Sequence, residues 1–243
     1  MDTTLESVVP GKARVSGVEA LRPLVSVRTR NKSRMGFLDN LVSAVFRKDP
    51  PIATTADLAD FLDSRSAFLA QKCVVEFCRV RAGVYWQKLF SEEEFREKLT
   101  ASCWQSFPPA AAMLAEMLEG AIRPAAGLRQ RRLPAAIEEV AASVFARHPL
   151  PAGAPDDFWD EARTLVRERL DATQAGPPRP VRKVAEPMAK LIHAALPIHK
   201  DIVEHDYDYI RNNLRMNLLR AHEDFLRVAD LNALADDLVG RGS

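Results

Sequence analysis

The sequence predicts an all-α protein: an irregular bundle of about nine helices with proline-rich joints and no significant sheet. Three observations carry this prediction. Apolar residues recur at helical spacing over most of the chain after residue 35. Proline pairs and a Gly-Pro run separate these stretches. No two segments show the alternating pattern that is typical of paired strands.

The composition is typical of a globular protein, and it bears on the class of partner and on the cellular location that we expect. The chain has 243 residues, of which 47% are hydrophobic and 28% charged, and its 34 basic residues nearly balance 33 acidic ones. This balance does not indicate a nucleic-acid-binding protein. Cys73, Cys78 and Cys103 lack metal-binding spacing and predict buried, inert thiols. Without a signal peptide or a run of about 18 apolar residues, we expect a cytoplasmic location.

The first 34 residues differ from the rest. Residues 1–34 show no steady period and end in a basic run, so they predict a flexible basic N-terminal extension. Residues 35–243 predict a single helical domain. The regular pattern begins abruptly at Met35, which makes Met35 an alternative translation start. The Gly-Pro-rich stretch 176–180 is the strongest linker signal, so a joint between two lobes near 174–181 is an alternative organisation.

The first half of the chain predicts five helices with recognisable boundaries, at residues 36–48, 54–62, 65–90, 92–104 and 110–122. Thr54 and Asp57 have the spacing of a capping box, and Ser64 can cap the next helix. The pair Pro108–Pro109 is expected to end one helix and begin another, because proline lacks the backbone donor that a helix interior needs.

The second half continues in the same way, with predicted helices at residues 134–147, 156–172, 182–196, 198–228 and 231–239. A basic loop, 123–132, precedes Pro134, which suits a first helical turn. Pro197 is expected to separate two helices, and Gly240 to follow the last one.

The long helix 65–90 carries the first candidate site. Its polar residues form one narrow stripe, so we expect protein to surround it at the centre of the bundle. Arg81 lies about opposite that stripe, where a guanidinium is costly unless it is paired. One interpretation is a structural ion pair with an acidic residue of another helix. The other is an anion-binding pocket formed by Arg81, Tyr85, Trp86 and Lys88.

A second candidate is the amphipathic segment near the chain start, whose apolar face comprises Phe37, Leu38, Leu41, Val42, Val45 and Phe46. Basic residues lie on both sides of it. This combination suits a helix in an anionic membrane interface, or one that contacts a partner protein. The alternative is that the same face packs on its own bundle.

Catalytic and cofactor motifs are absent from the sequence. It contains no P-loop, Rossmann glycine pattern, G-x-S-x-G or H-E-x-x-H. A stripe of acidic and histidine residues in helix 198–228 lies roughly opposite the apolar face and predicts a solvated surface. We therefore predict no catalytic residues, no cofactor and no metal site.

Two functions follow as hypotheses. The leading one is a non-enzymatic adaptor, assembly or regulatory protein that acts through protein–protein contacts, with the inner face of a membrane as a second location. The alternative is a helical small-ligand-binding protein or enzyme with an anion-binding pocket around Arg81, Tyr85 and Trp86. Nucleic acid ranks last as a partner, and the sequence does not decide the oligomeric state.

Overall fold

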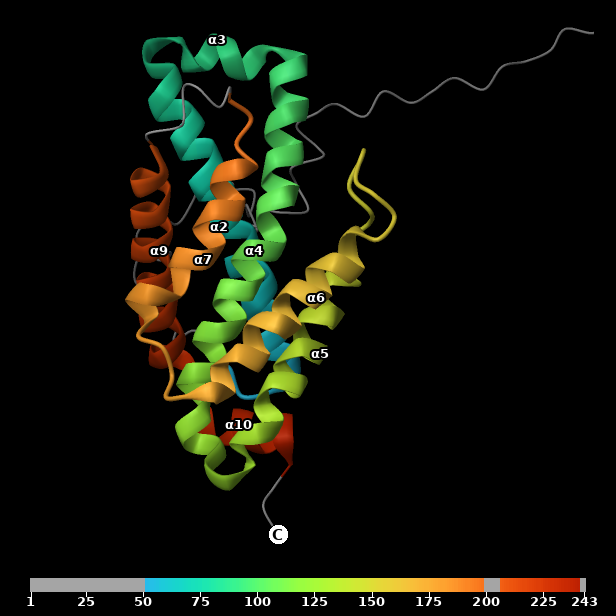
Figure 1. Cartoon of the computed structure of the whole chain (residues 1–243), viewed down its shortest axis with the longest axis vertical. Coiled ribbons are helices and arrows are strands. Elements are labelled where there is room, and N and C mark those ends of the chain that lie inside the picture. Colours follow the sequence, from blue (N-terminus) through green and yellow to red (C-terminus); the bar gives the residue numbers. More distant parts are fainter. Residues whose placement is uncertain (1–50, 199–205, 241–243) are drawn as a thin grey trace, which may run out of the picture.

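The computed structural model describes residues 51–198 and 206–240, and nearly all regular structure in these ranges is helical (Figure 1). Six α-helices have 13 or more residues: α2 Thr55–Ala82, α4 Glu93–Ala126, α5 Leu133–Phe145, α6 Phe158–Asp171, α7 Val181–Ala194 and α9 Tyr207–Val228. The shorter helices α3 Trp86–Ser91 and α10 Leu231–Val239 complete the α-helices of the described ranges. The predicted all-α class is confirmed, and the described ranges hold six long helices where about nine were predicted for the chain.

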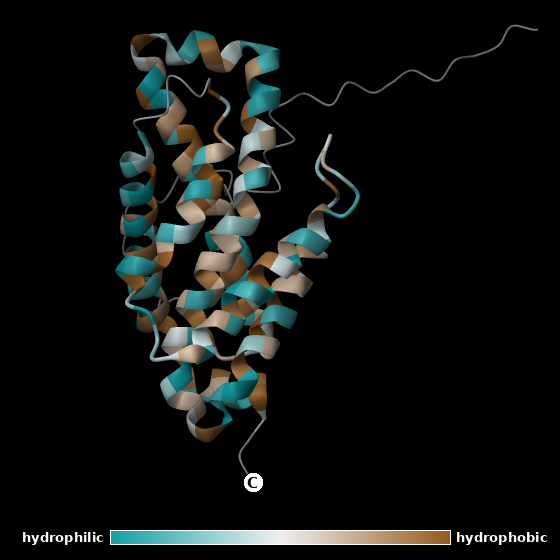
Figure 2. Ribbon diagram, viewed as in Figure 1, coloured by the Kyte–Doolittle hydropathy of each residue, from teal (hydrophilic) through white to brown (hydrophobic). Residues whose placement is uncertain are grey.

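Helix α4 forms the centre of the bundle. It packs against α2, α5, α6, α7, α9 and α10, and every residue from Ser102 to Glu119 is buried except Gln105. In Figure 2 the hydrophobic stretches lie mainly between the helices and the hydrophilic ones on their outer sides. The sequence placed helix 65–90 at the centre instead. The difference arises because small residues in α4, such as Ala110, Ala111 and Ala112, allow several helices to approach it closely.

The joint predicted at Pro108–Pro109 is wrong, because both prolines lie inside the continuous helix α4. A proline in a helix interior costs about 3 kcal/mol or more through a lost hydrogen bond and a ring clash. Here the two prolines and the apolar residues that follow are buried against neighbouring helices. We attribute the continuity of α4 to this burial, since packing routinely overrides local helix preference.

Helix α2 combines two predicted helices into one. The predicted capping box is confirmed: Asp57 N–H donates to Thr54 Oγ1 (3.2 Å), and Thr54 N–H donates to Asp57 Oδ2 (3.0 Å). The Thr54 hydroxyl also donates to Asp57 Oδ2 (2.8 Å), and this hydrogen bond, together with those from the backbone N–H groups of Ala53 and Thr54, lowers the pKa of Asp57. Ser64 is not a cap, because its hydroxyl donates to the Phe61 carbonyl within the helix (3.2 Å). The helix ends at Gly83, whose φ of +53° disfavours any residue with a side chain.

The start of the described chain is fastened to its end. Ile52 N–H donates to the Val228 carbonyl (3.1 Å), and Asp230 N–H donates to the Ile52 carbonyl (3.0 Å). Thr55 adds two hydrogen bonds to Asp237 of α10, both 2.6 Å long. The two Ile52 hydrogen bonds form the only β-bridge among the described residues, between Ile52 and Ala229. Together with the Thr55 bonds they join α2, α9 and α10 at the end of the bundle opposite α3 (Figure 1).

Two further boundaries differ from the sequence prediction. The segment expected as a basic loop, 123–132, is helical: α4 continues to Ala126, and a 3-10 helix, η3 Gly127–Arg132, follows it. Helix α9 begins at Tyr207 rather than at residue 198, with 199–205 outside the described residues. In the stretch 172–180, a 3-10 helix precedes a non-helical run, and the flanking helices α6 and α7 both pack on α4.

Candidate functional site

One end of the bundle exposes apolar side chains on a helical frame. We call it the α2–α3 end and define it by Val80, Val84, Tyr85 and Trp86, in the last turn of α2, in the 3-10 helix η2 Gly83–Tyr85 and at the start of α3. There α3 crosses between the tops of α2 and α4 (Figure 1), and Figure 2 shows hydrophobic residues along this end. Val84 is 88% exposed and Tyr85 73%.

Aromatic contacts hold α3 against the rest of the bundle. The Trp86 and Phe90 rings meet edge to face with their centroids 5.9 Å apart, and Phe90 contacts Phe95 of α4 at 5.4 Å. Phe90 also packs against the hydrophobic core. Trp86 therefore has a structural role in addition to its exposed surface. Val84 and Tyr85 project from a frame whose geometry these rings fix.

The four residues predicted as an anion-binding pocket lie at this surface. Tyr85, Trp86 and Lys88 are exposed, and Arg81 is 41% exposed rather than in the core. The expectation of burial is wrong here, because the last turn of α2 lies at the surface, where Arg79 and Val80 are also exposed. Arg81 Nε donates to Asp206 Oδ2 (2.6 Å), and the guanidinium makes a second contact with the same carboxylate. This hydrogen bond raises the pKa of Arg81.

Charges of both signs surround the α2–α3 end, with the acidic residues Glu76, Glu92, Glu93, Glu94 and Asp206 and the basic residues Arg79, Arg81, Lys88, Arg96 and Lys98. Glu94 is paired with Lys98 (2.6 Å). Arg79 is paired with Glu76 (3.3 Å), in addition to the Arg81–Asp206 pair. The surface thus presents apolar and aromatic groups among charges of both signs, several of which are paired.

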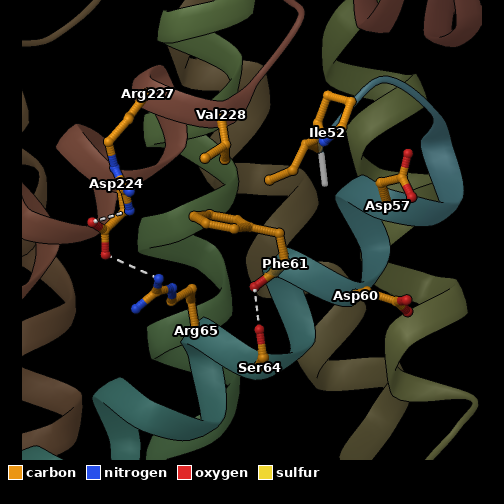
Figure 3. Close-up of a pocket in the computed structure, with 10 residues that line it drawn as sticks. Ile52, Asp57, Asp60, Phe61, Ser64, Arg65, Asp224, Arg227 and Val228 are labelled. Atoms are coloured by element: carbon orange, nitrogen blue, oxygen red, sulfur yellow. Dashed lines mark hydrogen bonds and ion pairs between the residues drawn. The ribbon is translucent and has the colours of Figure 1, made fainter. Parts of the chain in front are cut away.

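A surface pocket of about 360 Å³ lies at the other end of the molecule, between α2 and the end of α9 (Figure 3). Three of its charged groups are paired with one another: Asp224 binds Arg65 at 2.9 Å and Arg227 at 3.3 Å. Asp60 pairs with Arg147 outside the pocket (2.7 Å). The Arg65 guanidinium lies 5.5 Å from the centroid of the Phe61 ring. We assign this pocket a structural role, because these charges already serve to join α2 and α9.

The sequence prediction missed a cluster of buried charged residues. Glu116, Glu119 and Arg123 of α4 and Arg169 of α6 are all at least nine-tenths buried. Arg123 forms a two-pronged ion pair with Glu119 (2.8 and 2.6 Å). The sequence did contain a signal for this cluster. Glu116 and Glu119 are the only charged residues of the predicted helix 110–122, and Arg123 follows it directly. Their spacing places all three on one face of a helix.

The Glu116–Arg169 pair is held at an energetic cost. Burial raises the pKa of Glu116 and lowers that of Arg169, in each case outweighing the attraction between the two charges. Glu116 Oε2 contacts Arg169 Nε but accepts no well-aligned hydrogen bond from it. A charge pair that burial disfavours contributes little to stability, and such pairs are more frequent at functional sites.

The three cysteines are buried and unpaired, as the sequence predicted. Desolvation raises the pKa of each thiol to about 12, so at pH 8 about one in ten thousand is ionised. Because the thiolate is the reactive form, the native protein should release almost no thionitrobenzoate from Ellman's reagent within minutes. After unfolding in urea it should release three equivalents. Rapid labelling of a thiol in the native protein would contradict the burial of that residue.

The other predictions concern absent features or lie outside the described residues. The membrane or partner face Phe37–Phe46 lies outside them. Among residues 51–198 and 206–240, no helix is long and apolar enough to cross a bilayer. In the same ranges, no group of three or more His, Cys, Asp or Glu side chains could hold a metal ion.

Comparison with known proteins gave no match to a protein-family model, a curated protein or a solved structure.

Proposed function

We propose that this is a non-enzymatic helical protein that binds another protein through its α2–α3 end. The observation that carries the proposal is the exposure of Val84 and Tyr85 on a frame fixed by α2, α3 and α4. Exposed apolar groups on a rigid frame cost little conformational entropy when they are buried by a partner. Tyrosine, tryptophan and arginine, which dominate binding energies at protein interfaces, are all present in this surface.

The mixed charges favour a protein over an anionic membrane as the partner. Glu94 is paired with Lys98, Glu76 with Arg79 and Asp206 with Arg81, so the described residues of this end form no basic cluster of the kind that attracts anionic lipid. The alternative of an anion-binding pocket around Arg81 has less support, because the Arg81 guanidinium is already paired with the Asp206 carboxylate. Membrane binding through Phe37–Phe46 remains a separate prediction.

The test is affinity capture with matched variants. The double variant Val84→Asp/Tyr85→Asp places two charges in the proposed interface without touching the core. Leu128→Asp is the control, because Leu128 is fully exposed in η3 at the opposite end of the bundle. Each immobilised protein is incubated with extract of the native host, and the retained proteins are quantified by mass spectrometry.

We expect a partner that the wild type and Leu128→Asp retain equally and that the double variant retains at least about tenfold less, as for loss of interface hot spots. Far-UV circular dichroism should be the same for all three proteins. If the same proteins are retained by all three to the same extent, the α2–α3 end is not the binding surface.

A further inference from the structure

The buried charge cluster borders a cavity of about 280 Å³ that separates α4 from the connection between α6 and α7. Glu116, Glu119 and Arg123 line it from α4. The opposite wall comes from residues 172–179, including Pro177, Pro178 and Arg179. The cavity is smaller than the sites that hold drug-sized ligands, so only a small molecule would fit.

The walls of this cavity are fixed in place. Arg123 donates from NH1 to the Gly176 carbonyl (2.8 Å) and from NH2 to the Thr173 carbonyl (2.9 Å), which ties the connection to α4. A Cβ added at Gly120 would lie 3.3 Å from Pro178 Cβ, so the glycine allows the proline to pack directly on the helix. A site built this way loses little entropy on binding a ligand.

The buried charge cluster and Arg179 together carry one positive charge in excess. The cavity itself is lined by Glu116, Glu119, Arg123 and Arg179, whose charges balance. The excess comes from Arg169, which contacts Glu116 from behind the lining. All three nitrogen atoms of the Arg123 guanidinium donate hydrogen bonds, to Glu119 and to two carbonyls. The buried Arg169 donates to the Val184 carbonyl (2.8 Å) and contacts Glu116.

Arg179 is the cation with donors to spare. Its Nε lies 3.5 Å from Glu116 Oε1, and its NH1 and NH2 groups donate no hydrogen bond to the described residues. The side chain is 40% exposed, so the guanidinium is reachable from solvent where the cavity opens. Guanidinium groups bind carboxylate and phosphate through two parallel hydrogen bonds.

We propose that this cavity binds a small oxyanion, a phosphate or a carboxylate, with Arg179 as its principal ligand. The bound anion compensates the excess positive charge of the cluster. The site is distinct from the α2–α3 end, and the proposal does not depend on the proposed function.

The test is direct binding of inorganic phosphate and of acetate to the full chain, by isothermal titration calorimetry at constant ionic strength. Arg179→Gln removes the charge and Arg179→Lys keeps it without the two-pronged geometry. Arg182→Gln is the control, because Arg182 is a nearby exposed arginine that does not line the cavity. Circular dichroism verifies that each variant is folded, as expected for substitutions at partly exposed positions.

We expect saturable binding of at least one anion, weakened about tenfold or more by Arg179→Gln, less by Arg179→Lys and not by Arg182→Gln. Binding of phosphate alone would identify a phosphate site, and binding of acetate alone a carboxylate site. Either result supports the proposal. It is overturned if neither anion binds saturably, or if Arg179→Gln and Arg182→Gln weaken binding equally.

Discussion

Replacing Arg123 by methionine should lower the free energy of unfolding by about 3–5 kcal/mol, the loss typical of removing one partner from a buried ion pair. Glu119 is 1% exposed and would remain as a buried carboxylate, with the amide of Gln174 (2.9 Å) as its remaining donor among the described residues. The carbonyls of Thr173 and Gly176 would also lose their donor. Urea denaturation followed by circular dichroism measures the change.

Arg163 provides the matched control. It also contacts two glutamates, Glu138 at 2.9 Å and Glu139 at 2.5 Å, but it is 43% exposed. Because exposed ion pairs contribute about 0–1 kcal/mol, Arg163→Met should change stability little. Equal losses in Arg123→Met and Arg163→Met would show that burial does not set the contribution of the Arg123 pair.

Replacing Phe107 by alanine should also cost about 3–5 kcal/mol, because the side chain is fully buried and its removal leaves a cavity. The Phe107 ring contacts those of Trp104, Phe145, His148 and Trp159, with centroid distances between 5.2 and 6.3 Å. These rings join α4 to α5 and to the first turn of α6. Guanidinium denaturation measures the loss. The fluorescence of Trp104 and Trp159, whose rings contact Phe107, should change in the folded variant.

Phe68→Ala is the control for this substitution. Phe68 lies in α2 with 45% of its surface exposed, so its truncation leaves no enclosed cavity and should cost about 1 kcal/mol or less. A loss in Phe107→Ala no larger than that in Phe68→Ala would contradict the central position of Phe107 in the aromatic cluster.

Local signals in the sequence were sufficient for the helical class and for several boundaries. The capping box of Thr54 and Asp57 is confirmed, and the last helix, 231–239, agrees with α10. The errors occurred where packing overrides local preference. Pro108 and Pro109 normally break a helix, but the burial of α4 among its neighbours retains them within it.

The candidate sites show the same division between local and long-range information. The charged face of α4 is visible from spacing alone, but its partners Arg169 and Arg179 lie more than 40 residues away and are brought to it only by the fold. The exposure of Arg81 depends on how far the neighbouring helices extend beside α2, which no periodicity within α2 encodes. Tyr85 and Trp86 stay candidates, and the role proposed for them is now that of an exposed surface instead of a pocket.

The fastening of Ile52 to Val228 and Asp230 has a practical consequence for handling the molecule. It places the entry into α2 beside α10, so the described chain starts and finishes at one pole of the bundle (Figure 1). The 28 residues of α2 then set a distance of about 40 Å between that pole and Tyr85. A label or surface anchor joined just beyond residue 240 would therefore leave the opposite pole accessible, and a linker from 240 back to 51 would have only a short path to cover.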